Sequence, residues 1–147
     1  MSGVTSCDFL FISEWFNHVV GGEDVVLRQT SALECHQLFL GWLYETTIEV
    51  YAMKAIEIQG VDYRLVDTFD HLEIDTKFNL RCTSINQTVN DMLDDYDNID
   101  PQPLVESLSS YYYSHGRSFD SLKILPRNME KFEEMKDWAL DYYNYKS

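Results

Sequence analysis

The sequence predicts a single compact α/β (α+β) domain in which about five helices pack with a small antiparallel or mixed sheet. Its 147 residues suit one domain, and 45% of them are hydrophobic, which is enough for a packed core. The apolar residues follow a helical period at both ends of the chain and an alternating period in the middle. We therefore expect helical residues 8–44, β-rich residues 47–83 and helical residues 84–145.

Two helices are expected before the β-rich stretch. Between residues 8 and 19 the apolar residues recur at spacings of 3, 4 and 3, which marks one face of a helix. Asp8 is placed to cap this helix and Gly21-Gly22 to end it. A second, largely buried helix should begin near Thr30 or Ser31. Its inward-facing members are expected to be Leu33, His36, Leu38, Leu40 and Leu43.

The middle of the chain predicts strands. Residues 48–58 and 61–66 are rich in β-branched and aromatic side chains, and Gln59-Gly60 between them is a turn signal. This pattern predicts an antiparallel hairpin. Residues 78–83 alternate strictly between apolar and polar, which is typical of a half-buried edge strand.

Helical signals return after Thr83. Ser84 and Gln87 have the spacing of a capping box, in which each side chain satisfies the other residue's backbone donor. Asp100-Pro101 predicts a second start, with aspartate as cap and proline at the first helical position. Its apolar face consists of Leu104, Val105, Leu108 and either Tyr111 or Tyr112. The last helix should start at Asn128 and carry an apolar stripe of Phe132, Met135, Ala139 and Tyr142, widened by Trp138.

The charge of the chain is strongly negative and unevenly distributed. A formal net charge of −14 works against binding to phosphate backbones. Residues 91–100, called the acidic run below, hold five aspartates and neither lysine nor arginine. The run lacks the glycine and the later glutamate of a calcium loop. It is either a solvated helix end followed by a helix-capping turn or a patch that binds a basic protein, and we keep the second interpretation as the hypothesis. The candidate partner-binding residues are Asp91, Asp94, Asp95, Asp97 and Asp100.

Catalytic motifs are missing from the sequence. It contains no HExxH, GxSxG, P-loop or GxGxxG pattern, and no catalytic residue, metal or cofactor is expected. His36 lies among apolar residues and is interpreted as a structural histidine. A metal-dependent nuclease remains an alternative, because Asp62, Asp67 and Glu73 lie on or near the expected strands.

The chain is expected to act in the cytoplasm and away from membranes. No apolar run approaches the ~18 residues of a membrane span, and the start lacks a signal peptide pattern. Cys7, Cys35 and Cys82 are widely spaced and odd in number, which fits a reducing compartment. Six tyrosines in the C-terminal third could form a recognition surface, although packing against the helices is the simpler interpretation: Tyr111, Tyr112, Tyr113, Tyr142, Tyr143 and Tyr145.

Two segments resemble one family. Residues 30–38, TSALECHQL, resemble the SALxxHGL helix of AbiEi-type antitoxins of bacterial abortive-infection and toxin–antitoxin systems. Residues 82–91, CTSINQTVND, are similar to the T(S/T)xxRTxxD helix start of that family. Gln37 and Gln87 replace the glycine and the arginine of these motifs. The positions that match are Ser31, Ala32, Leu33, His36, Thr83, Thr88 and Asp91.

The resemblance implies a non-catalytic antitoxin or transcriptional regulator whose partner is a nucleotidyltransferase-like toxin. Operator binding in the family is attributed to a winged-helix part, and fewer than thirty residues precede Thr30 here. DNA binding by this chain alone is therefore not expected. The alternative is an acidic protein-binding module, or an inhibitor that mimics nucleic-acid charge.

Overall fold

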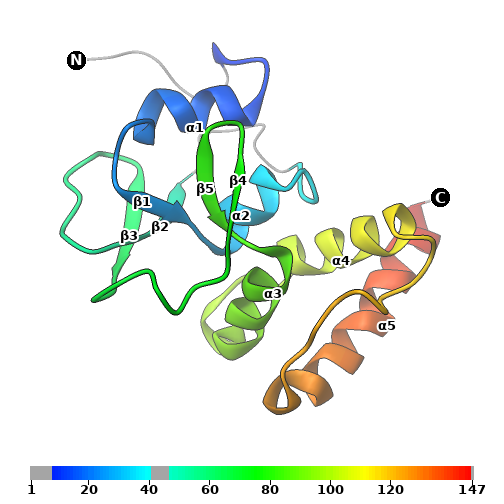
Figure 1. The fold of residues 1–147 in the computed structure, drawn as a ribbon. Coiled ribbons are helices and arrows are strands. Elements are labelled where there is room, and N and C mark those ends of the chain that lie inside the picture. Colours follow the sequence, from blue (N-terminus) through cyan, green and yellow to red (C-terminus); the bar gives the residue numbers. More distant parts are fainter. Residues whose placement is uncertain (1–7, 41–46, 147) are drawn as a thin grey trace.

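The computed structural model of the chain describes residues 8–40 and 47–146, with side chains up to residue 142 (Figure 1). The strands in this part are β1 Val25–Leu27, β2 Ile48–Ala52, β3 Val61–Leu65, β4 Ile74–Lys77 and β5 Leu80–Thr83. The helices are α1 Ile12–Val20, α2 Gln29–Cys35, α3 Ile85–Asp94, α4 Gln102–Ser114 and α5 Met129–Lys146, with 3-10 turns at Tyr96–Asn98 and Pro126–Asn128. The strands form one mixed sheet in the order β3-β2-β1-β5-β4, which confirms the predicted fold class.

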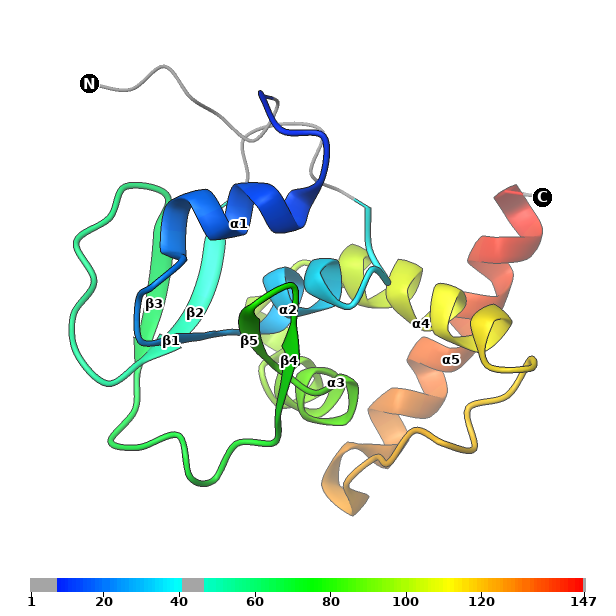
Figure 2. The same ribbon diagram turned by 45° about the horizontal axis from the view of Figure 1, so that its top comes forward.

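The first apolar core lies between α1 and the sheet. Ile12 and Phe16 of α1 pack with Leu27, Val50 and the other strand residues that point to the same face. Figure 2 shows α1 lying over one side of the sheet, while α4 and α5 project away from it. The amphipathic spacing in the sequence thus places α1 where its apolar face is needed.

The second core is helical. Leu33 of α2 packs with Met92 of α3, Leu104 of α4 and Met135 of α5. Because α2 also gives Ala32 to the first core, it joins the two cores into one domain. Of the two tyrosines predicted as alternatives for the apolar face of α4, Tyr111 is the one that is buried.

The first two helices differ in extent from the prediction. α1 begins at Ile12 and not at Asp8. Glu14 Oε1 accepts the backbone N–H of Phe11 at 3.2 Å, and this hydrogen bond fixes the start of the helix. α2 ends at Cys35, and Gln37 turns the chain with a positive φ of 63°. Leu40 consequently lies outside the helix and is 73% exposed. Residues 41–44, including Leu43, lie outside the described residues.

The central strand β1 was not predicted. It has only three residues, and all three are buried. Such a run shows no alternation, so the period test cannot detect it. β1 pairs antiparallel with β2 and parallel with β5, which places the start of α2 at the middle of the sheet.

The predicted hairpin of the second and third strands is wrong. β2 ends at Ala52, and β3 pairs with it in parallel, with Ile48 opposite Val61. The turn signal at Gln59-Gly60 does not reverse the chain directly against β2. Residues 53–60 return along the strand first, and Ile56 is buried in the first core on the way.

The predicted edge strand over residues 78–83 is also wrong in position. Phe78 and Asn79 both have positive φ and form the two-residue turn of a β4–β5 hairpin, a geometry that suits the twist of paired strands. The strand itself is β5, which lies inside the sheet between β1 and β4.

The helix starts after β5 agree with the prediction in place and differ in detail. Ser84 Oγ accepts the Gln87 N–H at 3.0 Å, but the Ser84 N–H donates to the Glu73 carbonyl at 2.8 Å instead of to Gln87. α4 starts at Gln102, one residue later than predicted, and Asp100 Oδ1 accepts its N–H at 3.0 Å.

The last helix starts at Met129, next to the predicted Asn128. Phe132, Met135 and Ala139 are buried as predicted, whereas Trp138 is 53% exposed and does not widen the buried stripe. No helix among the described residues has the length and apolar character to cross a membrane.

Candidate functional site

The two family-motif segments lie against each other in the structure. Buried His36 at the end of α2 donates from Nε2 to the Thr83 carbonyl at 2.8 Å. The hydroxyl groups of Thr83 and Thr88 form a hydrogen bond of 2.6 Å, and the Thr88 hydroxyl also donates to the Ser84 carbonyl. Ser31 accepts the Glu49 N–H at 2.9 Å. Ser31 thus joins α2 to β2, and the other contacts join α2 to β5 and to the start of α3; His36 is buried and hydrogen-bonded, as a structural histidine would be.

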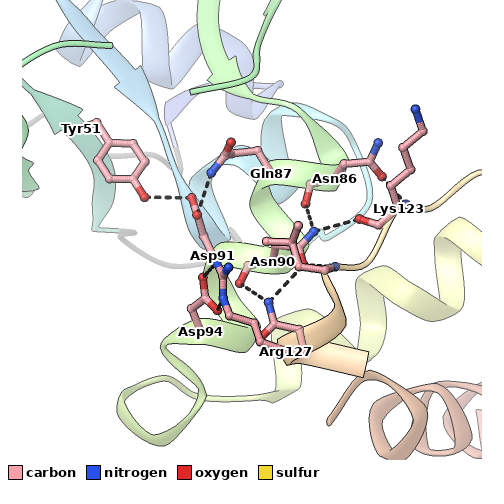
Figure 3. Close-up of polar contacts among 10 residues, drawn as sticks. Tyr51, Asn86, Gln87, Asn90, Asp91, Asp94, Lys123 and Arg127 are labelled. Carbon is pink, nitrogen blue, oxygen red and sulfur yellow. Dashed lines mark hydrogen bonds and ion pairs between the residues drawn. The ribbon is translucent and has the colours of Figure 1, made fainter. Parts of the chain in front are cut away.

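Helix α3 also lines a polar cleft, called the α3 cleft below (Figure 3). It has a volume of about 210 Å³ and holds carboxylates, amides and two cationic side chains. Its lining residues are Glu73, Asn86, Gln87, Asn90, Asp91, Asp94, Lys123, Leu125 and Arg127. Most of them come from α3 and from the segment between α4 and α5.

Asp91 lies between two donors at one end of the α3 cleft. Tyr51 Oη donates to Oδ2 at 2.8 Å, and Gln87 Nε2 donates to Oδ1 at 2.9 Å (Figure 3). Burial raises the pKa of Asp91, and the two hydrogen bonds oppose this rise because they favour the charged form. Oδ2 therefore holds α3 against β2, while Oδ1 is bound by Gln87 of α3 itself.

Asn90 joins α3 to the segment that precedes α5. Its Oδ1 accepts the Leu125 N–H at 2.9 Å, and its Nδ2 donates to the carbonyls of Lys123 at 2.9 Å and Asn86 at 2.8 Å. The Lys123 N–H donates in turn to Asn86 Oδ1 at 2.8 Å. The side-chain amides of Asn86 and Asn90 thus satisfy backbone groups of the irregular segment before α5, which has no strand or helix partner for them.

Asp94 lies one turn after Asp91 on α3 and lines the same cleft. Arg127 donates to it from Nε at 2.8 Å and from Nη2 at 2.7 Å. This two-bond pair lowers the pKa of Asp94 and lies at the surface.

The rest of the acidic run faces other parts of the molecule. Asp95 accepts from Gln29 Nε2 at 3.1 Å and from Asn98 Nδ2 at 2.9 Å, and these bonds lower its pKa. Asp97 is exposed, and Asp100 is exposed and caps α4. Asp91 therefore contacts β2, Asp94 the segment before α5 and Asp95 the start of α2, so the run is divided over several surfaces.

The carboxylates of the nuclease alternative lie apart along the chain's surface. Asp62 is on the exposed strand β3, Asp67 is in the connection after it, and Glu73 precedes β4. In the part of the chain that the structure describes, no group of three or more His, Cys, Asp or Glu side chains is placed to hold a metal ion.

A buried charged cluster beside the α3 cleft was missed by sequence reasoning. Arg28 is 6% exposed, and its guanidinium carbon lies 4.9 Å from the centre of the Tyr51 ring. Burial raises the pKa of Glu34 to about 8, and neighbouring Glu49 adds to the shift. Burial also raises the pKa of Glu49, while Arg28 lowers it. The only signal in the sequence is a charged residue that directly follows a short apolar run.

This cluster has the perturbed pKa values that often mark functional sites. Glu34 is only 2% exposed, however, so no substrate reaches its carboxyl group. In the α3 cleft the polar groups of Asn90, Asp91 and Asp94 already bind other parts of the chain. The arrangement is therefore suited to holding the fold and leaves surface carboxylates as the groups that can meet a partner.

Comparisons with known proteins assign no family to the chain. No family model matches the chain, and a search of curated proteins finds no match.

Proposed function

We propose that the chain is a non-catalytic, antitoxin-like or regulatory protein that acts by binding a protein partner. The observation that carries this proposal is the excess of surface carboxylates, since the formal net charge is −14 and Asp97 and Asp100 of the acidic run are exposed. Such a surface attracts a positively charged protein and speeds its association.

The resemblance of residues 30–38 and 82–91 supports the antitoxin class and implies a nucleotidyltransferase-like toxin as the partner. The buried contacts of His36 and Thr83 are consistent with motif residues that maintain the fold. The proposed place of action is the bacterial cytoplasm, and the free thiols of buried Cys35 and Cys82 suit a reducing compartment.

Co-expression with the product of the adjacent gene tests this proposal. The neighbouring protein should arrest growth when it is expressed alone, and the full chain should restore growth and co-purify with it. The yield of the complex should fall as salt is raised, because the attraction between surface charges is screened. Growth arrest that persists in the presence of this chain, with no complex retained at low salt, would contradict the proposal.

A further inference from the structure

We propose that a groove between α4 and α5 binds an arginine side chain of the protein partner. The groove, called the acidic groove below, has a volume of about 520 Å³. Asp100 and Val105 from the start of α4 line it together with Trp138, Asp141 and Tyr142 from α5. The inference rests on the proposed function, because it assumes a protein partner, and it names the surface and the chemistry of that contact.

An exposed tryptophan marks the acidic groove. Trp138 is 53% exposed, although Met135 and Ala139 on the same helix are completely buried. Tryptophan is the side chain most enriched among residues that dominate binding energy at interfaces. Val105 and Tyr142 line the same groove as Trp138, so the groove offers apolar side chains to an incoming residue.

The charges of the acidic groove are negative without a cation beside them. Asp100 and Asp141 are both exposed, and no lysine or arginine lines the groove among the described residues. The hydroxyl of Tyr142 is already used, because it donates to Glu106 at 2.7 Å. Asp100 Oδ1 already accepts the Gln102 N–H, so Asp141 is the main carboxylate of the groove that can pair with a positive charge from a partner.

Arginine fits this combination better than lysine does. Its planar guanidinium stacks on an indole, forms paired hydrogen bonds with a carboxylate and is less strongly hydrated than an ammonium group. A second copy of this chain fits less well, because two molecules with a net charge of −14 repel each other. A basic partner protein is the occupant that the charge and the exposed ring favour.

The test uses the full chain labelled with ¹⁵N and a capped pentapeptide, Gly-Arg-Gly-Arg-Gly, as the probe. The indole N–H signal of Trp138 should shift and saturate during titration, and Trp138→Gln should identify the signal. The same peptide with citrulline in place of arginine keeps the shape and loses the charge, so it should produce no saturating shift. Asp141→Asn should weaken arginine-peptide binding by about fivefold, the loss expected for ~1 kcal/mol.

Asp120→Asn is the matched control, because Asp120 is exposed and lies outside the acidic groove. It should leave the affinity for the arginine peptide unchanged. Equal weakening by both substitutions would show general charge attraction and would overturn the inference. Self-association that is abolished by Trp138→Gln would identify a second copy as the occupant instead.

Different results would overturn this inference and the proposed function. A co-expressed partner that still binds the Trp138→Gln and Asp141→Asn variants with full affinity would overturn the acidic groove alone. Absence of any retained partner would overturn the proposed function, whatever the peptide does.

Discussion

The α3 cleft and the acidic groove both contain two aspartates and several neutral polar groups, yet they use them differently. In the α3 cleft, Asp91 binds Tyr51 and Gln87, and Asp94 binds Arg127 through two hydrogen bonds. In the acidic groove, Asp100 and Asp141 border an exposed tryptophan and no cationic side chain among the described residues.

This difference separates charges that maintain the fold from charges that are available for binding. Changing a carboxylate that accepts two hydrogen bonds lowers the stability of the fold, whereas an exposed carboxylate such as Asp141 tolerates substitution. The acidic run in the sequence mixes both kinds, and only their partners in space tell them apart.

The largest effect is expected for Asn90→Ala in the α3 cleft. Asn90 is 6% exposed and binds the segment before α5 through the Leu125 N–H and the Lys123 carbonyl. Its removal leaves several partly buried backbone groups unpaired and should reduce the free energy of unfolding by about 2 kcal/mol. Urea denaturation measures the effect. The control is exposed Asn98→Ala, which should cost less than about 1 kcal/mol; similar losses in both would contradict a special role for the α3 cleft.

The next effect depends on pH and concerns Glu34, whose buried carboxyl group lies beside Glu49. Its pKa is raised to about 8 in the folded state from an ordinary value of 4.5. The folded state therefore holds a proton that the unfolded state releases, and stability falls as pH rises between these values. Glu34→Gln should remove this loss, so its stability advantage over the wild type should grow by about 2 kcal/mol from pH 6 to pH 8.

Urea midpoints at pH 6, 7 and 8 measure this difference. Glu57→Gln removes a charge from the exposed connection after β2 and should keep the wild-type dependence on pH. A Glu34→Gln curve parallel to that of the wild type would show that Glu34 does not hold the extra proton.

A smaller loss is expected for Tyr51→Phe. The substitution removes the hydroxyl that donates to Asp91 Oδ2 and should cost about 1–2 kcal/mol. Because this hydrogen bond lowers the pKa of Asp91, its loss should cost more at pH 8 than at pH 5. Thermal unfolding at the two pH values measures both effects, with Tyr63→Phe on the exposed strand β3 as the control. Equal stability of the two variants would mean that Asp91 does not need the donor.

The smallest change in stability is expected for Asp141→Asn in the acidic groove. Asp141 is exposed on α5, and its substitution should leave the urea midpoint unchanged within error. Removing one negative charge from a strongly acidic chain can only ease its self-repulsion. A loss as large as that of Tyr51→Phe would show that Asp141 belongs to the fold and would remove the contrast between the two regions.

Local signals in the sequence are sufficient for most helices. Ser84 predicts the start of α3, and the spacing of Phe132, Met135 and Ala139 predicts the buried face of α5. The strand topology depends on distant contacts. β1 is three residues long, and the parallel pairing of β2 with β3 depends on how residues 53–60 pack against the core. The apolar period of the sequence reveals neither the short strand β1 nor the parallel pairing.

The candidate site shows the same limit. Composition identifies the acidic run, but the partners of its carboxylates are far away in sequence. Tyr51 precedes Asp91 by 40 residues, Arg127 follows Asp94 by 33, and Gln29 precedes Asp95 by 66. Trp138 fits the apolar period of α5 and yet is 53% exposed. The sequence therefore predicts which residues carry charge and cannot predict which of them remain available.

One measurement tests the contrast between the two regions most directly: the affinity of the arginine pentapeptide for Asp141→Asn and for Asp94→Asn, at low and at high salt. Both variants lose one surface carboxylate, so general attraction would weaken equally in each. We predict that Asp141→Asn binds about fivefold more weakly and depends less on salt, while Asp94→Asn matches the wild type. Weaker binding by Asp94→Asn, with Asp141→Asn unchanged, would contradict the account.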